Sequence, residues 1–218
     1  MPGEFEGWPR AAFDVLLQLD GEPSLEVRRL WRRDREELVR RPMVELLDAI
    51  AAADPAYEDF AVWRYGGVLL EAWQRQGAIV RLAQNVELSL RFDLDGLEVS
   101  LAWWYAPPEQ IERYRAAAAD PGSGRRLTAI IRKLELEGFE ISGDQLKRPL
   151  RGYPADHPRA ELLRHRSLIA TRPLGCDDWI HTAAAVDRVV TAFTQLRPLA
   201  RWLVGNVSRP PAGLHHDD

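Results

Sequence analysis

The chain has 218 residues, of which 46% are hydrophobic and 28% charged, and its formal net charge is −4. This length and composition are typical of a globular protein with one substantial core, and they exclude a disordered or fibrous chain. Nucleic-acid and membrane-surface binders usually present a net positive field, so the acidic balance argues against nucleic acid and membrane as partners.

The cysteine count and the opening residues indicate the compartment. Cys176 is the only cysteine in the sequence, which excludes an internal disulfide framework and a multi-cysteine zinc site. Residues 1–10 lack the basic and then apolar pattern of a secretory signal, and no segment approaches the roughly 20 apolar residues of a membrane span. We therefore expect a cytoplasmic protein without a membrane segment.

Helical spacing of apolar residues predicts helices in the first quarter of the chain, and the first runs from Pro9 to the breaker at 20–23. Ser24 is a suitable N-cap for the second helix. This helix is predicted to bury an apolar stripe formed by Val27, Leu30, Trp31 and Leu38. Its basic face is predicted to be solvated and consists of Arg28, Arg29, Arg32, Arg33 and Arg35. Pro42 either kinks this helix or opens a third one.

Strands are predicted from Phe60 onward, where the apolar period changes toward two. The clearest element is a β-hairpin over 86–103, in which apolar residues alternate on both sides of an Asp95-Gly96 turn and form one buried face. Trp103 and Trp104 are adjacent and must point to opposite faces of a regular strand. One of them is therefore expected in the core, and the other against a helix, a partner or a ligand.

The second half of the chain predicts further helices and short strands. A helix follows Pro107 and stops at a turn over 120–124, and the next helix ends at Gly138. Short strands are predicted at 139–141 and 167–171, with a short helix between them and a closing helix that Pro198 interrupts. This order predicts an α+β fold, a central and mainly antiparallel sheet covered by helices. We expect a single domain over 1–207 and a disordered tail over 208–218.

Two segments of the chain resemble a known bacterial family. The stronger segment, 146–158, reads Leu-Lys-Arg-Pro-Leu-Arg-Gly-Tyr-Pro-Ala-Asp-His-Pro and is followed by 161–167, by Arg197-Pro198-Leu199 and by Trp202-Leu203. It is similar to the C-terminal half of the domain of unknown function 2461. Residues 5–9 resemble the opening of that family. The resemblance implies a fold and no activity, and the family's Lys-rich central segment has no counterpart at 64–76, where no lysine stands.

A local excess of positive charge marks the candidate site. From Gly143 to Arg172 there are seven Lys or Arg residues and three acids, in a chain that is acidic overall. Because guanidinium groups present paired donors to phosphates and carboxylates, we predict a site for a small anionic ligand. The predicted ligand-binding residues are Lys147, Arg148, Arg151, Tyr153, Asp156, His157, Arg164 and Arg166. His157, beside Asp156, is the candidate proton donor or acceptor if the site is catalytic.

The same residues have a structural explanation. Asp156-His157-Pro158 is also a helix start, with a polar cap followed by proline in the first turn. Arg148 and Arg151 can equally pair with surface carboxylates. A noncatalytic protein-protein interaction module is the alternative function, in which a Trp-bearing sheet face and the Arg-rich helix meet a partner protein.

Other candidate chemistry is weaker. Cys176 with His181 forms a conceivable nucleophile pair, although a structural thiol fits better because no orienting group or oxyanion site is recognisable. The tail, 215–218, reads His-His-Asp-Asp, which fits a solvated tail better than a metal site. Trp63, Trp73 and the Trp103-Trp104 pair allow base stacking but are more typical of a core or a protein contact. We expect no cofactor and no metal, and whether the protein is an enzyme is left open.

Overall fold

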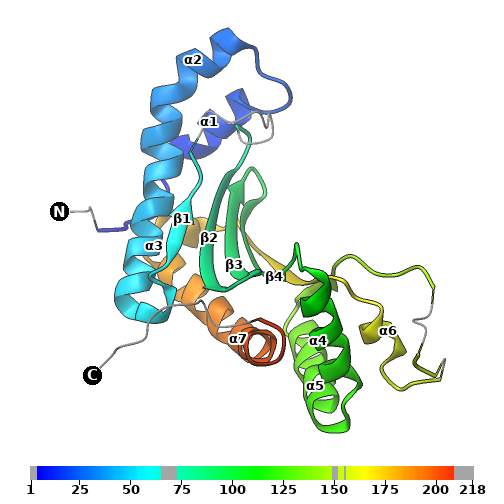
Figure 1. Cartoon of the computed structure of the whole chain (residues 1–218). Helices are drawn as coiled ribbons and strands as arrows, with labels where there is room; N and C mark the ends of the chain where they lie inside the picture. The colour runs from blue at the N-terminus through cyan, green and yellow to red at the C-terminus, as the bar shows by residue number, and fades with distance from the viewer. Residues whose placement is uncertain (1–3, 65–72, 149–151, 155, 209–218) are drawn as a thin grey trace, which may run out of the picture. The chain divides into compact units, whose positions relative to one another are not determined.

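The computed structural model describes residues 4–64, 73–148, 152–154 and 156–208 (Figure 1). The helices are α1 (Ala11–Gln18), α2 (Leu25–Asp34), a π-helix (Arg35–Arg40), α3 (Arg41–Ala53), a 3-10 turn (Pro55–Tyr57), α4 (Pro108–Ala119), α5 (Pro121–Leu136), α6 (Ala160–Leu163), a 3-10 turn (Asp178–His181) and α7 (Ala184–Asn206). The strands are β1 (Phe60–Val62), β2 (Gln76–Ala83), β3 (Val86–Asp93), β4 (Gly96–Trp103), β5 (Glu140–Ser142) and β6 (Leu168–Gly175). Among the described residues, no helix is both long and apolar enough to cross a membrane.

The strands form one six-stranded antiparallel sheet in the order β1-β2-β3-β4-β6-β5. β1 pairs with β2, placing Phe60 opposite Val80, and β5 pairs with β6, placing Glu140 opposite Thr171. Residues along β3 alternate between buried and half-buried, and the predicted hairpin is present, with its turn at Leu94-Asp95 and Gly96 opening β4. The predicted α+β class and the mainly antiparallel sheet are therefore confirmed.

The described chain divides into two compact units. The first contains residues up to Val80 together with Ser89–Val99 and Pro173–Phe193, and the second contains Arg81–Leu88, Ser100–Arg172 and the residues from Thr194 onward. Of the predicted tail, 208–218, only Ser208 belongs to the described residues. Its hydroxyl donates to the carbonyl of Gln84 at 2.8 Å.

Aromatic side chains build the core of the first unit around Trp8, which is fully buried. Its ring stacks on Phe92 with centroids 4.5 Å apart, and its indole N–H donates to the carbonyl of Val39 at 3.0 Å. Phe5 and Phe13 pack edge-on against this pair. The opening of the chain is thereby tied to the helix at residue 39 and to β3, because burying an indole requires a partner for its N–H.

The long helical segment of the first unit departs from α geometry in its middle. α2 is capped as predicted, since Ser24 Oγ accepts a hydrogen bond from Val27 N at 3.3 Å. The chain then runs through the π-helix into α3, which Pro42 opens at its second residue (Figure 1). A π turn holds more residues than an α turn and so changes which face of a helix is buried.

The predicted buried stripe of this segment is wrong, since no residue of α2 is buried and Val27, Trp31 and Leu38 are only half-buried. Leu30, placed in the buried stripe, is 73% exposed, and Arg35, placed on the solvated face, is fully buried. Arg35 donates to the carbonyls of Trp73 and Arg75 at 3.0 and 2.7 Å and to Gln76 Oε1 at 3.2 Å. Burial lowers the pKa of Arg35 to about 8, so the group is still mostly cationic at pH 7. Residue 35 follows Trp31 by four positions and so lies on the face of the predicted stripe, and the error came from placing an arginine in solvent by its residue type.

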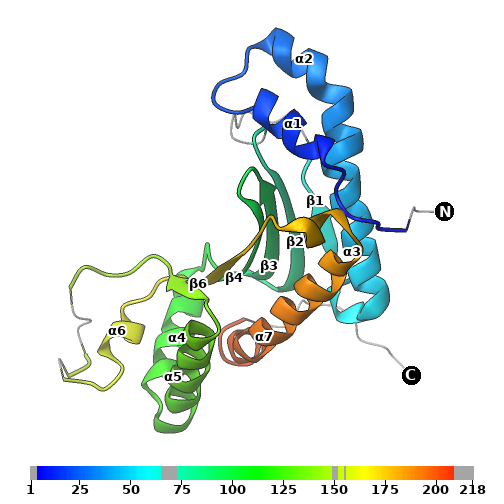
Figure 2. The ribbon, with the colours of Figure 1, turned by 180° about the vertical axis from the view of Figure 1, so that it is seen from behind.

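The core of the second unit is centred on Trp103, which is fully buried. Its ring stacks on Tyr114 of α4 with centroids 4.8 Å apart, and its indole N–H donates to Gln110 Oε1 at 3.1 Å. Tyr114 also contacts the ring of Trp202, and its hydroxyl donates to the carbonyl of Leu162. α4 and α5 lie side by side in both views (Figures 1 and 2).

Two predicted boundaries in the second half of the chain are wrong. Residues 121–124 form the first turn of α5, because Asp120 caps this helix by accepting from the N–H groups of Gly122 and Ser123 at 2.9 and 2.7 Å. α7 continues through Pro198 to Asn206. Leu196 and Leu199 are fully buried on either side of this proline, and their burial offsets the hydrogen bond that proline removes.

Candidate functional site

Backbone hydrogen bonds join two short segments of the second unit, 144–146 and 164–167. The N–H of Leu146 donates to the carbonyl of Arg164 at 2.9 Å, and the N–H of Arg166 donates to the carbonyl of Asp144 at 2.7 Å. Arg164 Nε also donates to the Leu146 carbonyl at 2.7 Å, and Asp144 N donates to Ser167 Oγ at 2.7 Å. We call this arrangement the clamp, and it uses much of the predicted basic segment to hold the chain together.

His165 is the buried centre of the clamp, and 3% of its surface is exposed. Its Nδ1 lies 2.8 Å from the carbonyl of Ser167, which can only accept, so Nδ1 carries the proton. Its Nε2 then accepts from the side-chain amide of Gln145 at 2.8 Å. Burial lowers the pKa of His165, against a smaller opposing effect of the Ser167 hydrogen bond. The neutral imidazole is the form that satisfies both partners.

Two arginines of the predicted anion site, Arg164 and Arg166, form ion pairs with neighbouring carboxylates. Arg164 lies 3.2 Å from a carboxylate oxygen of Glu161, and Arg166 lies 2.6 Å from a carboxylate oxygen of Asp144. Both pairs are partly exposed, so they contribute little to stability. Lys147, Arg148 and Asp156 are exposed, and Arg151 lies outside the described residues.

His157 lies in the turn that leads into α6, but Asp156 and Pro158 do not form the predicted cap and first turn, because α6 begins at Ala160 after Arg159 and has no side-chain cap. The Nδ1 of His157 accepts from the N–H of Arg159 at 3.1 Å, and its carbonyl accepts from the N–H of Ala160 at 2.9 Å. Tyr153 presents a ring edge to it, with centroids 6.1 Å apart. His157 also lines a hollow of about 300 Å³ with α5 and α6, which Arg166 does not line. The described members of the predicted site therefore do not all line one hollow.

A second hollow, of about 400 Å³, opens beside the clamp. We call it the aromatic hollow; its lining residues are Trp104, Tyr105, Ala106, Ile111, Asp144, Arg166, Ser167 and Ile169. The rings of Trp104 and Tyr105 have centroids 4.8 Å apart and planes inclined at 38°, and Tyr105 is 82% exposed. The hollow combines two aromatic rings with a guanidinium, a carboxylate and a hydroxyl group. As predicted for adjacent strand residues, Trp103 is in the core and Trp104 is on the other face.

The backbone at Tyr105 is held in an uncommon conformation. Its backbone φ is +47°, and that of Asn85 is +64°. Residues other than glycine rarely adopt such positive values. The carbonyl of Asn85 accepts from the N–H of Trp104, and the side-chain amide of Asn85 donates to the carbonyl of Tyr105, both at 3.2 Å. These bonds hold the strained residue in place, and backbone strain of this kind is frequent at functional sites.

Glu87 adds a titratable group next to Trp104. Burial raises the pKa of Glu87, and the opposing effects of a hydrogen bond from the Trp104 side chain and of the charge of Arg81 are smaller. A carboxyl group with a raised pKa can hold a proton closer to neutral pH than an ordinary one. Glu87 is a half-buried carboxyl group hydrogen-bonded to the Trp104 side chain.

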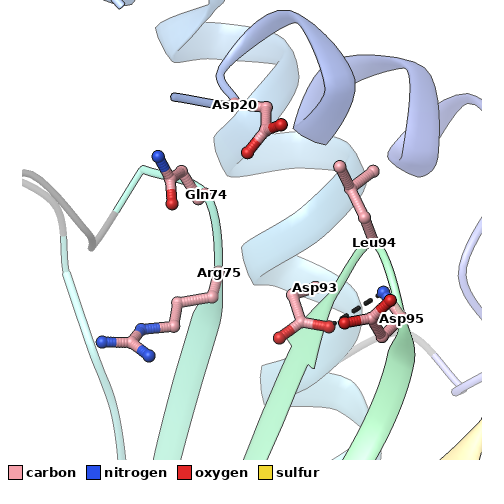
Figure 3. Close-up of a pocket in the computed structure, with 6 residues that line it drawn as sticks. All are labelled: Asp20, Gln74, Arg75, Asp93, Leu94 and Asp95. Carbon is pink, nitrogen blue, oxygen red and sulfur yellow. Dashed lines mark hydrogen bonds between the residues drawn. The ribbon is translucent and has the colours of Figure 1, made fainter. Parts of the chain in front are cut away.

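A third hollow, of about 460 Å³, belongs to the first unit and is lined by acidic residues (Figure 3). Asp93 Oδ1 accepts from the N–H of Asp95, and Asp93 Oδ2 lies 3.0 Å from Arg91 Nε. Figure 3 shows the Arg75 side chain extending away from the two aspartates. Because the Asp93 carboxylate is used by the hairpin turn, this hollow offers no convergent ligand set.

The remaining sequence candidates that the structure describes do not form a site, and Cys176 is an exposed free thiol where the sequence favoured a structural one. His181 donates through Nδ1 to the carbonyl of Trp8 at 2.7 Å. Among the described residues, no group of three or more His, Cys, Asp or Glu is arranged to hold a metal ion. His215 and His216 lie outside the described residues.

The protein is an α+β protein with a single sheet. Its aromatic hollow lies in the second unit. A family model described as conserved hypothetical protein (DUF2461) matches residues 77–202, more than half of the chain. The chain belongs to this family, as its resemblance over 146–167 predicts. The match includes every residue of the aromatic hollow and does not extend to residues 5–9 or 64–76. Searches of curated proteins and of solved structures found no match.

Sequence reasoning found Arg166 and noted Trp104, but it missed Tyr105 as a site residue. The available signal was Asn85, which lies in a turn where a positive φ is common for asparagine. Nothing in the sequence indicates that residue 85 bonds to residue 105, because that contact depends on how β2, β3 and β4 align.

Proposed function

We propose that this protein binds a small ligand that carries both a flat ring and an anionic group, in the aromatic hollow. The observation that carries the proposal is that Arg166 of the predicted basic segment lines the same hollow as the paired rings of Trp104 and Tyr105. Of the residues predicted for the anion site over 147–166, this proposal keeps only Arg166.

The ring pair supplies the apolar part of the site. Tyr105 is largely exposed although its backbone is strained, and neither property contributes to a core. An aromatic face in a hollow of this size favours stacking with a planar ligand. Ile111 and Ile169 add apolar surface to the lining.

Arg166 supplies the charged part of the site. Its guanidinium is half-exposed and bound to a single carboxylate, that of Asp144, among the residues described. A ligand carboxylate or phosphate can replace or share this partner, because a guanidinium offers five N–H donors. The ligand class is therefore an aromatic carboxylate or an aromatic phosphate.

Ligand-observed NMR with a panel of aromatic carboxylates and phosphates tests the proposal, followed by calorimetry on the full chain. Arg166→Ala and Tyr105→Ala should each weaken binding by about tenfold or more, since each removes a direct contact. Lys133→Ala, on the exposed face of α5, removes the same charge outside the hollow and should have no effect. Equal losses in all three variants, or binding by none of the compounds, would contradict the proposal.

A second candidate function is a protein contact, the alternative noted from the sequence. Leu17, Leu25 and Leu30 of the first unit are 60%, 69% and 73% exposed, and arginines lie beside them along α2. Large exposed apolar patches are typical of interaction surfaces, and these leucines are candidates for one. Analytical ultracentrifugation of the wild type and of the double variant Leu25→Glu with Leu30→Glu tests whether the partner is a second copy of the chain.

A further inference from the structure

A fourth hollow, of about 530 Å³, lies between the beginning of α5 and the end of α7 within the second unit. We call it the two-arginine hollow; its lining residues are Gly122, Ser123, Arg126, Arg201, Trp202, Gly205 and Asn206. None of them appears in the predicted anion site, and no residue is shared with the aromatic hollow.

The hollow is lined by two cations and by no acid. Arg126 and Arg201 are both exposed, and neither forms an ion pair or a side-chain hydrogen bond with another described residue. Arg33, Arg40, Arg91, Arg164 and Arg166, by contrast, each pair with a carboxylate. Two like charges beside one cavity repel each other, and a bound anion would relieve that repulsion.

Three of the lining residues are hydrogen-bonded to one another. The indole N–H of Trp202 donates to the carbonyl of Ser123 at 3.1 Å, and the side-chain amide of Asn206 donates to the carbonyl of Trp202 at 2.8 Å. The hydroxyl of Ser123 lies 3.3 Å from Asn206 Oδ1. The bonds of Ser123 with Trp202 and Asn206 join α5 to α7, the two helices on which Arg126 and Arg201 lie.

Packing does not account for the glycine at 205. Apart from its own helix, no described part of the chain lies within 4 Å of the place where a Cβ at Gly205 would stand. Glycine within a helix is less favourable than alanine, and the open space gives alanine no steric penalty. A glycine at such a place allows a bound group to approach the helix backbone closely.

From these observations we propose that the two-arginine hollow binds a phosphate group, held between Arg126 and Arg201. A phosphate monoester offers three terminal oxygens and close to two negative charges, so it can accept from both guanidinium groups and compensate both of their charges. The volume leaves room for a small molecule attached to that phosphate. This site is independent of the ligand proposed for the aromatic hollow.

Isothermal titration calorimetry of the full chain with inorganic phosphate and with pyrophosphate, at constant ionic strength, tests the proposal. Arg126→Gln and Arg201→Gln should each weaken binding by about tenfold, and the double variant should abolish it. Lys133→Gln lies on the same helix and should bind as the wild type does, and so should Arg166→Ala, which changes only the aromatic hollow.

Binding that survives the double variant would overturn the assignment, and so would an equal loss in Lys133→Gln, which would indicate general attraction to positive charge. Loss of phosphate binding in Arg166→Ala alone would place the anion in the aromatic hollow instead. Because Arg126 and Arg201 are both exposed, an unchanged thermal midpoint is expected for each variant and verifies that the fold is intact.

Discussion

Arg166 contacts Asp144 twice, donating its backbone N–H to the Asp144 carbonyl at 2.7 Å and its guanidinium to the Asp144 carboxylate at 2.6 Å. The first contact belongs to the clamp and does not depend on the side chains. The second competes with any anion that approaches the aromatic hollow. A change of the Asp144 side chain should therefore alter ligand binding while the backbone hydrogen bond of the clamp stays in place.

We predict that Asp144→Asn strengthens the binding of an aromatic carboxylate. The amide keeps an acceptor for Arg166 but removes the negative charge that competes with the ligand. We expect the dissociation constant to fall severalfold by calorimetry, while the free energy of unfolding stays within about 1 kcal/mol because the ion pair is half-exposed. Weaker binding in this variant would show that the ligand needs the carboxylate, as a cationic or zwitterionic compound would.

Replacing the buried cation of the first unit should be strongly destabilising. Arg35→Met leaves the carbonyls of Trp73 and Arg75 without their guanidinium donor in a buried setting. We expect a loss of roughly 2–4 kcal/mol in the free energy of unfolding, measured by urea denaturation. Arg29→Ala, an exposed residue of α2, is the control and should leave the midpoint unchanged. Similar midpoints for the two variants would refute the structural role of Arg35.

The clamp should respond to pH through His165. Its pKa is lowered in the folded chain, so between that value and the unfolded value near 6.5 the unfolded state binds more protons. Stability is then complete above about pH 6.5 and falls as the pH drops through this window. An NMR titration of the His165 ring should give a midpoint below 6.5, and a midpoint at or above that value would contradict the buried neutral form.

Two glycines should respond in opposite directions to alanine. Gly143 has a φ of +137°, and a Cβ there would lie 2.3 Å from the carbonyl oxygen of Ser167, whereas Gly205 faces open space. We expect Gly143→Ala to cost about 2 kcal/mol or more and Gly205→Ala to add about 0.5–1 kcal/mol. Thermal denaturation of both variants measures the difference, and a stable Gly143→Ala protein would argue against the close approach of the clamp.

Much of the fold follows from local sequence signals. Ser24, the hairpin turn at Asp95 and Gly138, whose φ is +85°, act where the sequence places them, because caps and turns depend on residues close in the chain. The errors arise where distant contacts decide the outcome. Pro198 remains within α7 because buried leucines flank it, and Arg35 is buried because residues 73–76 provide its acceptors.

The candidate site was harder to predict from sequence than the fold. The charge excess over 143–172 predicts an anion site, but most of the described arginines in this segment serve backbone contacts, as Arg159 does by donating to the carbonyls of Ala118 and Ala119. The arginines of the two-arginine hollow, Arg126 and Arg201, are 75 positions apart in the sequence. Counting charges along the sequence cannot show that these two arginines line one hollow, because the packing of α5 against α7 brings them together.

The π-helix at 35–40 has a bearing on homologues of other lengths. A π turn accommodates about one additional residue, and one residue rotates an α-helix by about 100°. A homologue shorter by one residue in this stretch would regain α geometry and turn all earlier residues by that angle. A gap in an alignment at this place would then indicate a homologue in which the residues of α2 face about 100° away from their direction in this chain.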